Sequence, residues 1–126
     1  MRRKRYLEKL EWLEREISFA AEHSMSDEVR KRAVLYSLMT AVEAAMDIVA
    51  MLVKDMGKQV EDDYTNISKL LDEGVVDEGE AELLRKYNGL RNAITHHYIP
   101  TEALMQLDEL YGIAVKLVKA AERLLG

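Results

Sequence analysis

Residues 89–98 carry the densest group of potentially chemical side chains in this 126-residue sequence. Arg91, Asn92, His96, His97 and Tyr98 lie close together there, and they include two of the three histidines of the chain. Arginine supplies a permanent charge and a planar fork that fits phosphate, and histidine can give or take a proton near neutral pH. The segment therefore indicates phosphoryl chemistry. The alternative is that the histidines only occupy a last helical turn, where the helix dipole favours a cation.

Helix geometry sorts these side chains into two directions. On an ideal helix, Asn92 and His96 lie roughly 40° apart and Arg91 and Tyr98 about 20° apart, whereas Arg91 and His96 diverge by about 140°. A single straight helix would thus send the arginine and the histidine to opposite walls of a cleft. Two arrangements would bring them together: unwinding of the last turn before Pro100, or a second copy of the helix that completes the site.

The sequence predicts neither a metal nor a cofactor. His96 and His97 point about 100° apart on a helix, so they do not chelate one ion as an i, i+4 pair does. The chain has no cysteine, which excludes disulfides, thiolate catalysis and Cys-ligated zinc. A glycine-rich phosphate loop, a serine nucleophile elbow and a zinc-hydrolase signature are also absent from the sequence.

Length and composition predict one soluble domain over residues 1–126. The chain is 48% apolar and 33% charged with a formal net charge of -5, and its charged first residues lead into an amphipathic pattern rather than a signal peptide. We therefore expect a cytoplasmic protein. An acidic balance provides no global attraction for nucleic acid, so a phosphate-binding surface must be a local cluster of Arg and His.

The elements that position the motif are predicted to be helices. One proline and few glycines leave little room for strands, and apolar residues recur at three- and four-residue steps. We expect an all-α, up-and-down bundle of four to five helices. The predicted helices cover residues about 3–22, 27–57, a short stretch within 58–76, 77 to about 98, and 102–125. Residue 27 is the predicted N-cap of the second helix, and residue 77 begins the fourth with a capping-box-like pattern.

The second predicted helix is apolar nearly all round between residues 33 and 53. A membrane span is disfavoured, because Glu43 and Asp47 near its middle would each cost roughly 2.5 to 3.5 kcal/mol there. The pattern favours a buried central helix in a protein that does not enter membranes. Thr40, Glu43 and Asp47 form one narrow polar stripe, which is either a solvent-facing seam or a set of acceptors for basic groups on another helix.

The segment Arg91-Asn-Ala-Ile-Thr-His96-His-Tyr98 resembles the Arg-x4-His-x-Tyr motif of the HEPN superfamily, specifically of HepT toxins that pair with minimal-nucleotidyltransferase (MNT) antitoxins. The likeness covers most of the chain from about 34 to 111. It includes a buried second helix with the sequence Val-Glu-Ala-Ala-Met-Asp-Ile over 42–48, the pair Asp63-Tyr64, and the segments 70–77 and 89–92.

The resemblance implies an all-α bundle that forms a two-fold homodimer and cleaves RNA without a metal, with the motifs of two subunits facing each other. His96 would be the general acid or base for attack of a ribose 2'-hydroxyl on the adjacent phosphate. Arg91 would stabilise the charge that develops on the phosphate. Asn92 would orient His96 or bind RNA, and Glu43 and Asp47 would anchor Arg91.

The resemblance also implies a means of control. In such toxins the motif tyrosine can be adenylylated by the partner nucleotidyltransferase, so Tyr98 would be the acceptor of AMP. An anionic adduct beside Arg91 would occupy the phosphate site and repel RNA.

Two other interpretations stay open from the sequence. One is a non-catalytic HEPN subunit that binds nucleotide or RNA and serves as a platform for a nucleotidyltransferase. The other is a purely structural helical dimer, which would neither bind nor cut RNA.

Overall fold

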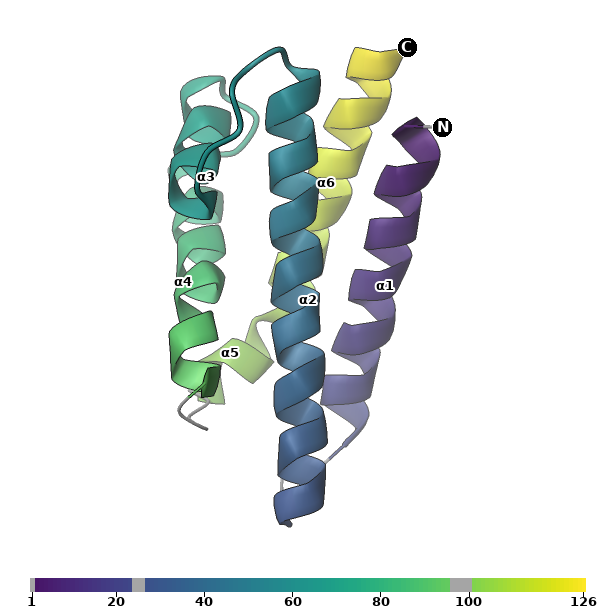
Figure 1. The fold of residues 1–126 in the computed structure, drawn as a ribbon, viewed down its shortest axis with the longest axis vertical. Helices are drawn as coiled ribbons and strands as arrows, with labels where there is room; N and C mark the ends of the chain where they lie inside the picture. The colour runs from purple at the N-terminus through teal and green to yellow at the C-terminus, as the bar shows by residue number, and fades with distance from the viewer. Residues whose placement is uncertain (1, 24–26, 96–100) are drawn as a thin grey trace.

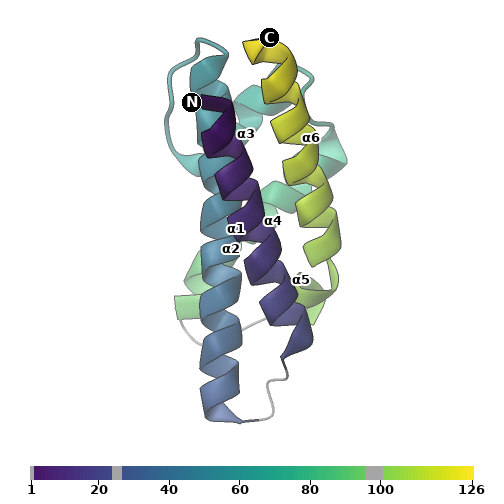
Figure 2. The same ribbon diagram turned by 90° about the vertical axis from the view of Figure 1, so that its right-hand side faces the viewer.

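The computed structural model describes residues 2–23, 27–95 and 101–126, and these residues form six helices and no strand. The helices are α1 (Arg2–Glu22), α2 (Glu28–Asp55), α3 (Asp63–Asp72), α4 (Glu78–Thr95), α5 (Thr101–Met105) and α6 (Leu107–Leu125). Figures 1 and 2 show the long helices aligned along one axis. The predicted all-α bundle is confirmed, with the short α5 as an additional element.

α2 is the central helix of this bundle. It lies between α1 on one side and α3 and α4 on the other, with α6 packed against it (Figures 1 and 2). α2 is long and apolar enough to cross a membrane by length and composition, but 72% of its most apolar stretch is buried inside the bundle. The prediction of a buried core helix is therefore confirmed.

The predicted starts of α2 and α4 are confirmed by capping hydrogen bonds. Asp27 caps α2, since its Oδ1 accepts from the Arg30 backbone N–H at 2.8 Å. Asp77 and Glu80 form a reciprocal capping box at the start of α4: the Glu80 N–H donates to Asp77 at 2.8 Å, and the Asp77 N–H donates to Glu80 at 2.9 Å. These bonds satisfy backbone donors that a helix start leaves free.

The start of α3 is fixed by a buried asparagine. Asn66 is 1% exposed, and its side chain accepts from the Glu61 N–H at 2.8 Å and donates to the Glu61 carbonyl at 3.1 Å. Asp62 caps the helix through the Thr65 N–H. At the other end Gly74 has φ 74°, a conformation that other residues rarely adopt, and it lets the chain turn back into α4. α3 and α4 therefore form an antiparallel hairpin.

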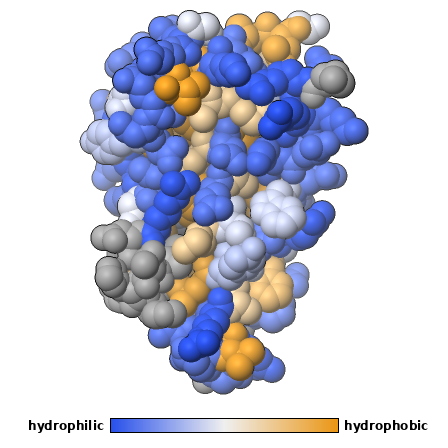
Figure 3. All heavy atoms as spheres, in the orientation of Figure 1, coloured by the Kyte–Doolittle hydropathy of each residue, from blue (hydrophilic) through white to orange (hydrophobic). Residues whose placement is uncertain are grey.

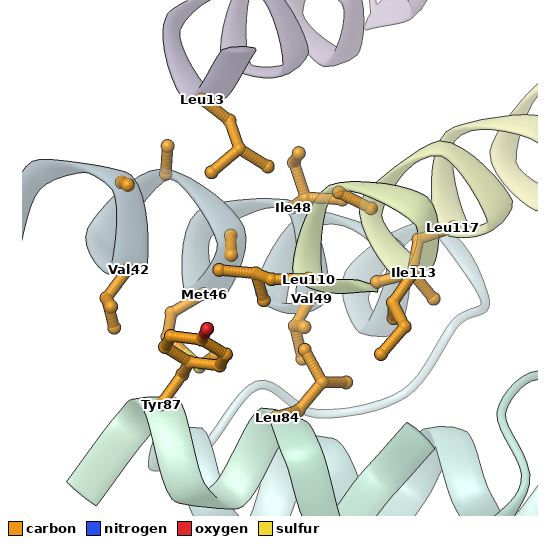
Figure 4. Close-up of a cluster of buried hydrophobic side chains, with 14 of the residues drawn as sticks. Leu13, Val42, Met46, Ile48, Val49, Leu84, Tyr87, Leu110, Ile113 and Leu117 are labelled. Carbon is orange, nitrogen blue, oxygen red and sulfur yellow. The ribbon is translucent and has the colours of Figure 1, made fainter. Parts of the chain in front are cut away.

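One face of α4 holds it in the core. Leu84 and Tyr87 point from α4 toward Met46 and Val49 of α2 and Leu110 of α6 (Figure 4). Burying a side chain of this size contributes about 1.5 to 3 kcal/mol relative to exposure. Because this face is committed to the core, other sides of α4 carry its polar residues.

The last predicted helix is divided, which corrects the expectation of one helix over 102–125. Gln106 has φ -104° and ψ 12° and separates α5 from α6. α5 lies beside the lower end of α4 in Figure 1, and the buried Tyr87 hydroxyl donates to the Ala103 carbonyl. The break thus gives α4 and α5 a direct buried hydrogen bond.

α1 is attached to the end of α2 by a partly buried polar cluster. The Tyr6 hydroxyl donates to Asp55 at 2.7 Å and the Arg2 Nε donates to the same carboxylate at 2.8 Å. Burial alone would raise the pKa of Asp55, but the hydrogen bonds from Arg2 and Tyr6 outweigh it and hold that pKa below its ordinary value. Burial raises the pKa of Tyr6, so its hydroxyl stays a donor.

Candidate active site

Arg91 lies in the second half of α4, where an ion pair attaches it to α3. Its Nη1 is 3.0 Å from the Oδ2 of Asp63, the first residue of α3. The Arg91 side chain is 40% exposed and that of Asp63 is 25% exposed. The pair therefore attaches a partly exposed guanidinium of α4 to the first residue of α3.

The other residues of the motif are only partly within the described chain. The backbone of Asn92 belongs to α4, but its side chain lies outside the described part. His96, His97 and Tyr98 lie in the segment 96–100, also outside it. Their roles and the predicted divergence of Arg91 and His96 remain predictions.

Glu43 and Asp47 lie on the exposed side of α2, and the partners found here differ from those expected. Asp47 pairs with Lys9 of α1 at 2.8 Å, whereas Arg91 pairs with Asp63. Both α2 acids line a groove of about 330 Å³ between α1 and α2, together with Trp12. In this structure the ion pair that holds Arg91 thus comes from α3 rather than from the two acids of α2, and in the polar stripe of α2 Asp47 accepts from a basic group of another helix, Lys9 of α1.

A second arginine of α4 lies against α3, one that sequence reasoning missed. The Arg85 Nη2 donates to the Ser68 hydroxyl at 2.8 Å, and its guanidinium carbon lies 4.8 Å from the centre of the Tyr64 ring. The sequence holds a signal for the pair of Tyr64 with Arg85. In an antiparallel hairpin, residues about equally far from the turn face each other, which brings Tyr64 to Arg85; the rule does not predict the pair of Asp63 with Arg91, because Arg91 lies farther from the turn.

Tyr87 secures the two helices on either side of the segment 96–100. Its ring is 1% exposed, and its hydroxyl donates to Ala103 at the start of the next described element. Burial raises the pKa of Tyr87, and nearby Glu109 adds to the effect. The neutral hydroxyl therefore keeps α5 fixed against α4 next to the motif.

Among the described residues of the motif, Arg91 is the candidate for binding a phosphate. Within residues 2–23, 27–95 and 101–126 no group of three or more His, Asp or Glu side chains is placed to hold a metal ion. Arg91 can bind a phosphate oxygen through charge-assisted hydrogen bonds. Proton transfer would have to come from a residue outside the described ranges, such as His96.

Comparison with known proteins identifies the family of the chain. The model of a family described as "HepT-like: Ribonuclease HepT-like" matches residues 3–122. A protein from Archaeoglobus fulgidus named "Putative RNase" is 75% identical over the full length of both chains. A second one from that organism, with the same name, is 41% identical over 99% of this chain and 96% of its own.

A shorter similarity is found in another archaeon. A "Putative RNase" from Methanocaldococcus jannaschii is 56% identical over 56% of this chain and 80% of its own. No solved structure matches the chain. The family match extends over nearly every helix described above, so the chain belongs to the ribonuclease HepT-like family.

Proposed function

We propose that this protein is a metal-independent endoribonuclease, the toxin of a toxin–antitoxin pair, that acts in the cytoplasm. Support for a ribonuclease comes from the family and from relatives named as RNases. The structural observation that carries the proposal is the Arg91–Asp63 ion pair at 3.0 Å, because it holds a partly exposed guanidinium five residues before His96.

The proposed reaction is attack by a ribose 2'-hydroxyl on the adjacent phosphorus. The new bond joins the 2'-oxygen to phosphorus, the bond to the 5'-oxygen breaks, and the products end in a 2',3'-cyclic phosphate and a 5'-hydroxyl. His96 accepts the 2'-hydroxyl proton as base or donates a proton to the leaving oxygen as acid, a role typically worth about 10² to 10⁴ in rate. Arg91 stabilises the charge that develops on the phosphate.

The active protein is proposed to be a homodimer. On an ideal helix Arg91 and His96 diverge, so two motifs that face each other across a two-fold axis would supply one residue from each wall. Asn92 is proposed to orient His96 or to bind RNA. Glu43 and Asp47 are exposed on α2, and they are proposed to support a site built from two chains.

Silencing is proposed to occur on Tyr98 by a partner nucleotidyltransferase of the MNT type. Transfer of AMP from ATP to the Tyr98 hydroxyl releases pyrophosphate and adds a phosphodiester next to Arg91. That anion would compete with the RNA phosphate for the guanidinium. Incubation with the partner enzyme and ATP should add the mass of one adenylyl group to the wild type and nothing to Tyr98→Phe.

The proposed activity is tested with the full chain, freed of any adduct, and RNA in excess EDTA. Wild type should yield 2',3'-cyclic phosphate ends, His96→Ala and Arg91→Ala should yield none, and the neighbouring variant His97→Ala should cut like wild type. Intact RNA with folded, dimeric wild type would contradict the enzyme. RNA bound but never cut would favour the non-catalytic partner subunit.

A further inference from the structure

The face of α4 toward α3 carries two arginines that differ in their partners. Arg85 and Arg91 are six residues apart, about 9 Å along the helix. Arg91 is paired with a carboxylate, whereas Arg85 has no carboxylate partner among the described residues. Arg85 is thus the guanidinium on this face whose charge is not neutralised by a neighbouring acid.

The hydrogen-bonding capacity of Arg85 is largely unused. A guanidinium has five N–H donors, and the described chain engages Arg85 through one bond, to the Ser68 hydroxyl. Its Nε is buried without a partner among the described residues, whereas the residue as a whole is partly exposed. Such a group is held in place and still has donors for a phosphate.

Tyr64 adds an exposed aromatic surface at the same point. Its side chain is 57% exposed although it is large and apolar, and the Arg85 guanidinium lies against its ring at 4.8 Å. Much of the ring therefore remains open to solvent. An open aromatic ring next to a fixed cation is the combination by which proteins bind single-stranded nucleic acid, through base stacking and a phosphate contact.

The opposite side of α4 is unsuited to RNA. The groove of about 550 Å³ between α4 and α6 is lined by Asp77, Glu80, Glu82 and Glu109, with Lys86 as the one basic side chain among its lining residues. These carboxylates would repel phosphate. The side of α3 and α4 seen in Figure 3 is mainly hydrophilic, and it leads toward the end of α4 where the motif begins.

We propose that Tyr64 and Arg85 form a nucleotide-binding subsite beside the Arg91 motif, in which the Tyr64 ring stacks on a base of single-stranded RNA and Arg85 binds a backbone phosphate. This subsite rests on the proposed ribonuclease function. It holds the strand one to two helical turns from Arg91 and so positions the scissile phosphate.

The test measures binding of a fluorescent single-stranded 2'-O-methyl RNA, which lacks the attacking hydroxyl. Tyr64→Ala should bind about 10-fold more weakly, within the range known for base stacking, and Tyr64→Phe should bind like wild type. Arg85→Gln should weaken binding and reduce the slope of log affinity against log salt by roughly 0.7, the value for one phosphate on a single strand. Lys86→Gln, the next residue on the acidic side, is the matched control and should keep wild-type affinity.

A purely structural role of Arg85 is separated by two further measurements. Arg85→Lys keeps the charge, so it should recover part of the affinity lost in Arg85→Gln if the contact is to phosphate. With cleavable RNA the subsite variants should raise KM and leave kcat near wild type. Loss of kcat with unchanged KM, together with a lowered Tm, would overturn the subsite in favour of a packing role.

The outcomes also separate this inference from the ribonuclease proposal. If wild type binds and cuts RNA and both Tyr64→Ala and Arg85→Gln behave like it, the subsite is overturned and the ribonuclease stands. If RNA binds with the expected losses but is never cut, the subsite stands and the ribonuclease does not. If wild type neither binds nor cuts RNA, both are overturned.

Discussion

Asp63 on α3 holds Arg91 on α4 through an ion pair of 3.0 Å, and this contact joins the two arms of the α3–α4 hairpin next to the motif. The contact depends on where α3 begins, which Asn66 fixes through two hydrogen bonds to Glu61. A catalytic arginine has to be held near its working geometry, since small displacements reduce rates strongly. We therefore assign Asp63 the role of positioning Arg91.

Asp63→Asn should reduce cleavage more than stability. The ion pair is partly exposed, so its loss should cost less than about 1 kcal/mol of unfolding free energy. We expect kcat/KM to fall roughly 10-fold because Arg91 is no longer held. In the Arg91→Ala background the same substitution should have no further effect, and an equal loss in both backgrounds would contradict the positioning role.

Asn66→Ala should destabilise the start of α3. The substitution leaves the Glu61 N–H and carbonyl without their buried partner, which should cost about 1 to 3 kcal/mol in urea unfolding. Cleavage should fall as well, because Asp63 moves with the helix start. Thr65→Ala, which removes an exposed hydroxyl bond to Asp62, is the control and should change stability by less than about 1 kcal/mol. Equal effects of the two variants would refute the special role of Asn66.

Tyr87→Phe tests the hydrogen bond between α4 and α5. Removing the hydroxyl leaves the buried Ala103 carbonyl without that donor, and we expect a loss of about 1 to 3 kcal/mol. The matched variant Tyr111→Phe removes a hydroxyl that has only a long, exposed contact of 3.4 Å to Glu14, and should cost less than about 0.5 kcal/mol. Chemical denaturation of both variants measures these losses of unfolding free energy. A smaller loss for Tyr87→Phe than for Tyr111→Phe would contradict the role of the Tyr87 hydrogen bond.

The Asp55 cluster should make stability depend on acid pH. Since the pKa of folded Asp55 lies below its ordinary value of 3.8, its contribution is complete well above pH 3.8 and is lost as the pH falls through the lower folded value. Asp55→Asn should therefore cost about 1 to 3 kcal/mol at pH 7 and progressively less below about pH 4. Asp47→Asn, in an exposed pair, should show little change. If the difference in unfolding free energy between wild type and Asp55→Asn stays constant with pH, the predicted contribution of ionised Asp55 to stability is contradicted.

Local signals in the sequence predicted the helices well. The Asp27 cap, the Asp77–Glu80 capping box and the buried face of α2 all follow from patterns within one or two turns. The break at Gln106 has no such signal, because Leu104, Leu107 and Leu110 keep helical spacing across it. It shows only in three dimensions, where Ala103 meets Tyr87.

Pairing between helices was harder to predict. The acids of α2 were expected to hold Arg91, but α1 supplies Lys9 to Asp47, and α3 supplies Asp63 to Arg91. Which acid meets which arginine depends on the length of the loop before α3 and on the turn at Gly74. The periodicity of apolar residues does not predict the register between two helices. The symmetry of the hairpin about its turn does bring Tyr64 to Arg85.

The central claim is that Arg91 and His96 promote attack by a ribose 2'-hydroxyl, and a single 2'-deoxy substitution tests it most directly. An RNA oligonucleotide is first mapped with wild-type protein in EDTA, and the nucleotide that supplies the attacking hydroxyl at the main cleavage site is then replaced by its deoxy form. We predict that cleavage stops at that position, continues at the other sites, and disappears everywhere with His96→Ala. Continued cutting at the deoxy position, or undiminished cutting by His96→Ala, would contradict the account.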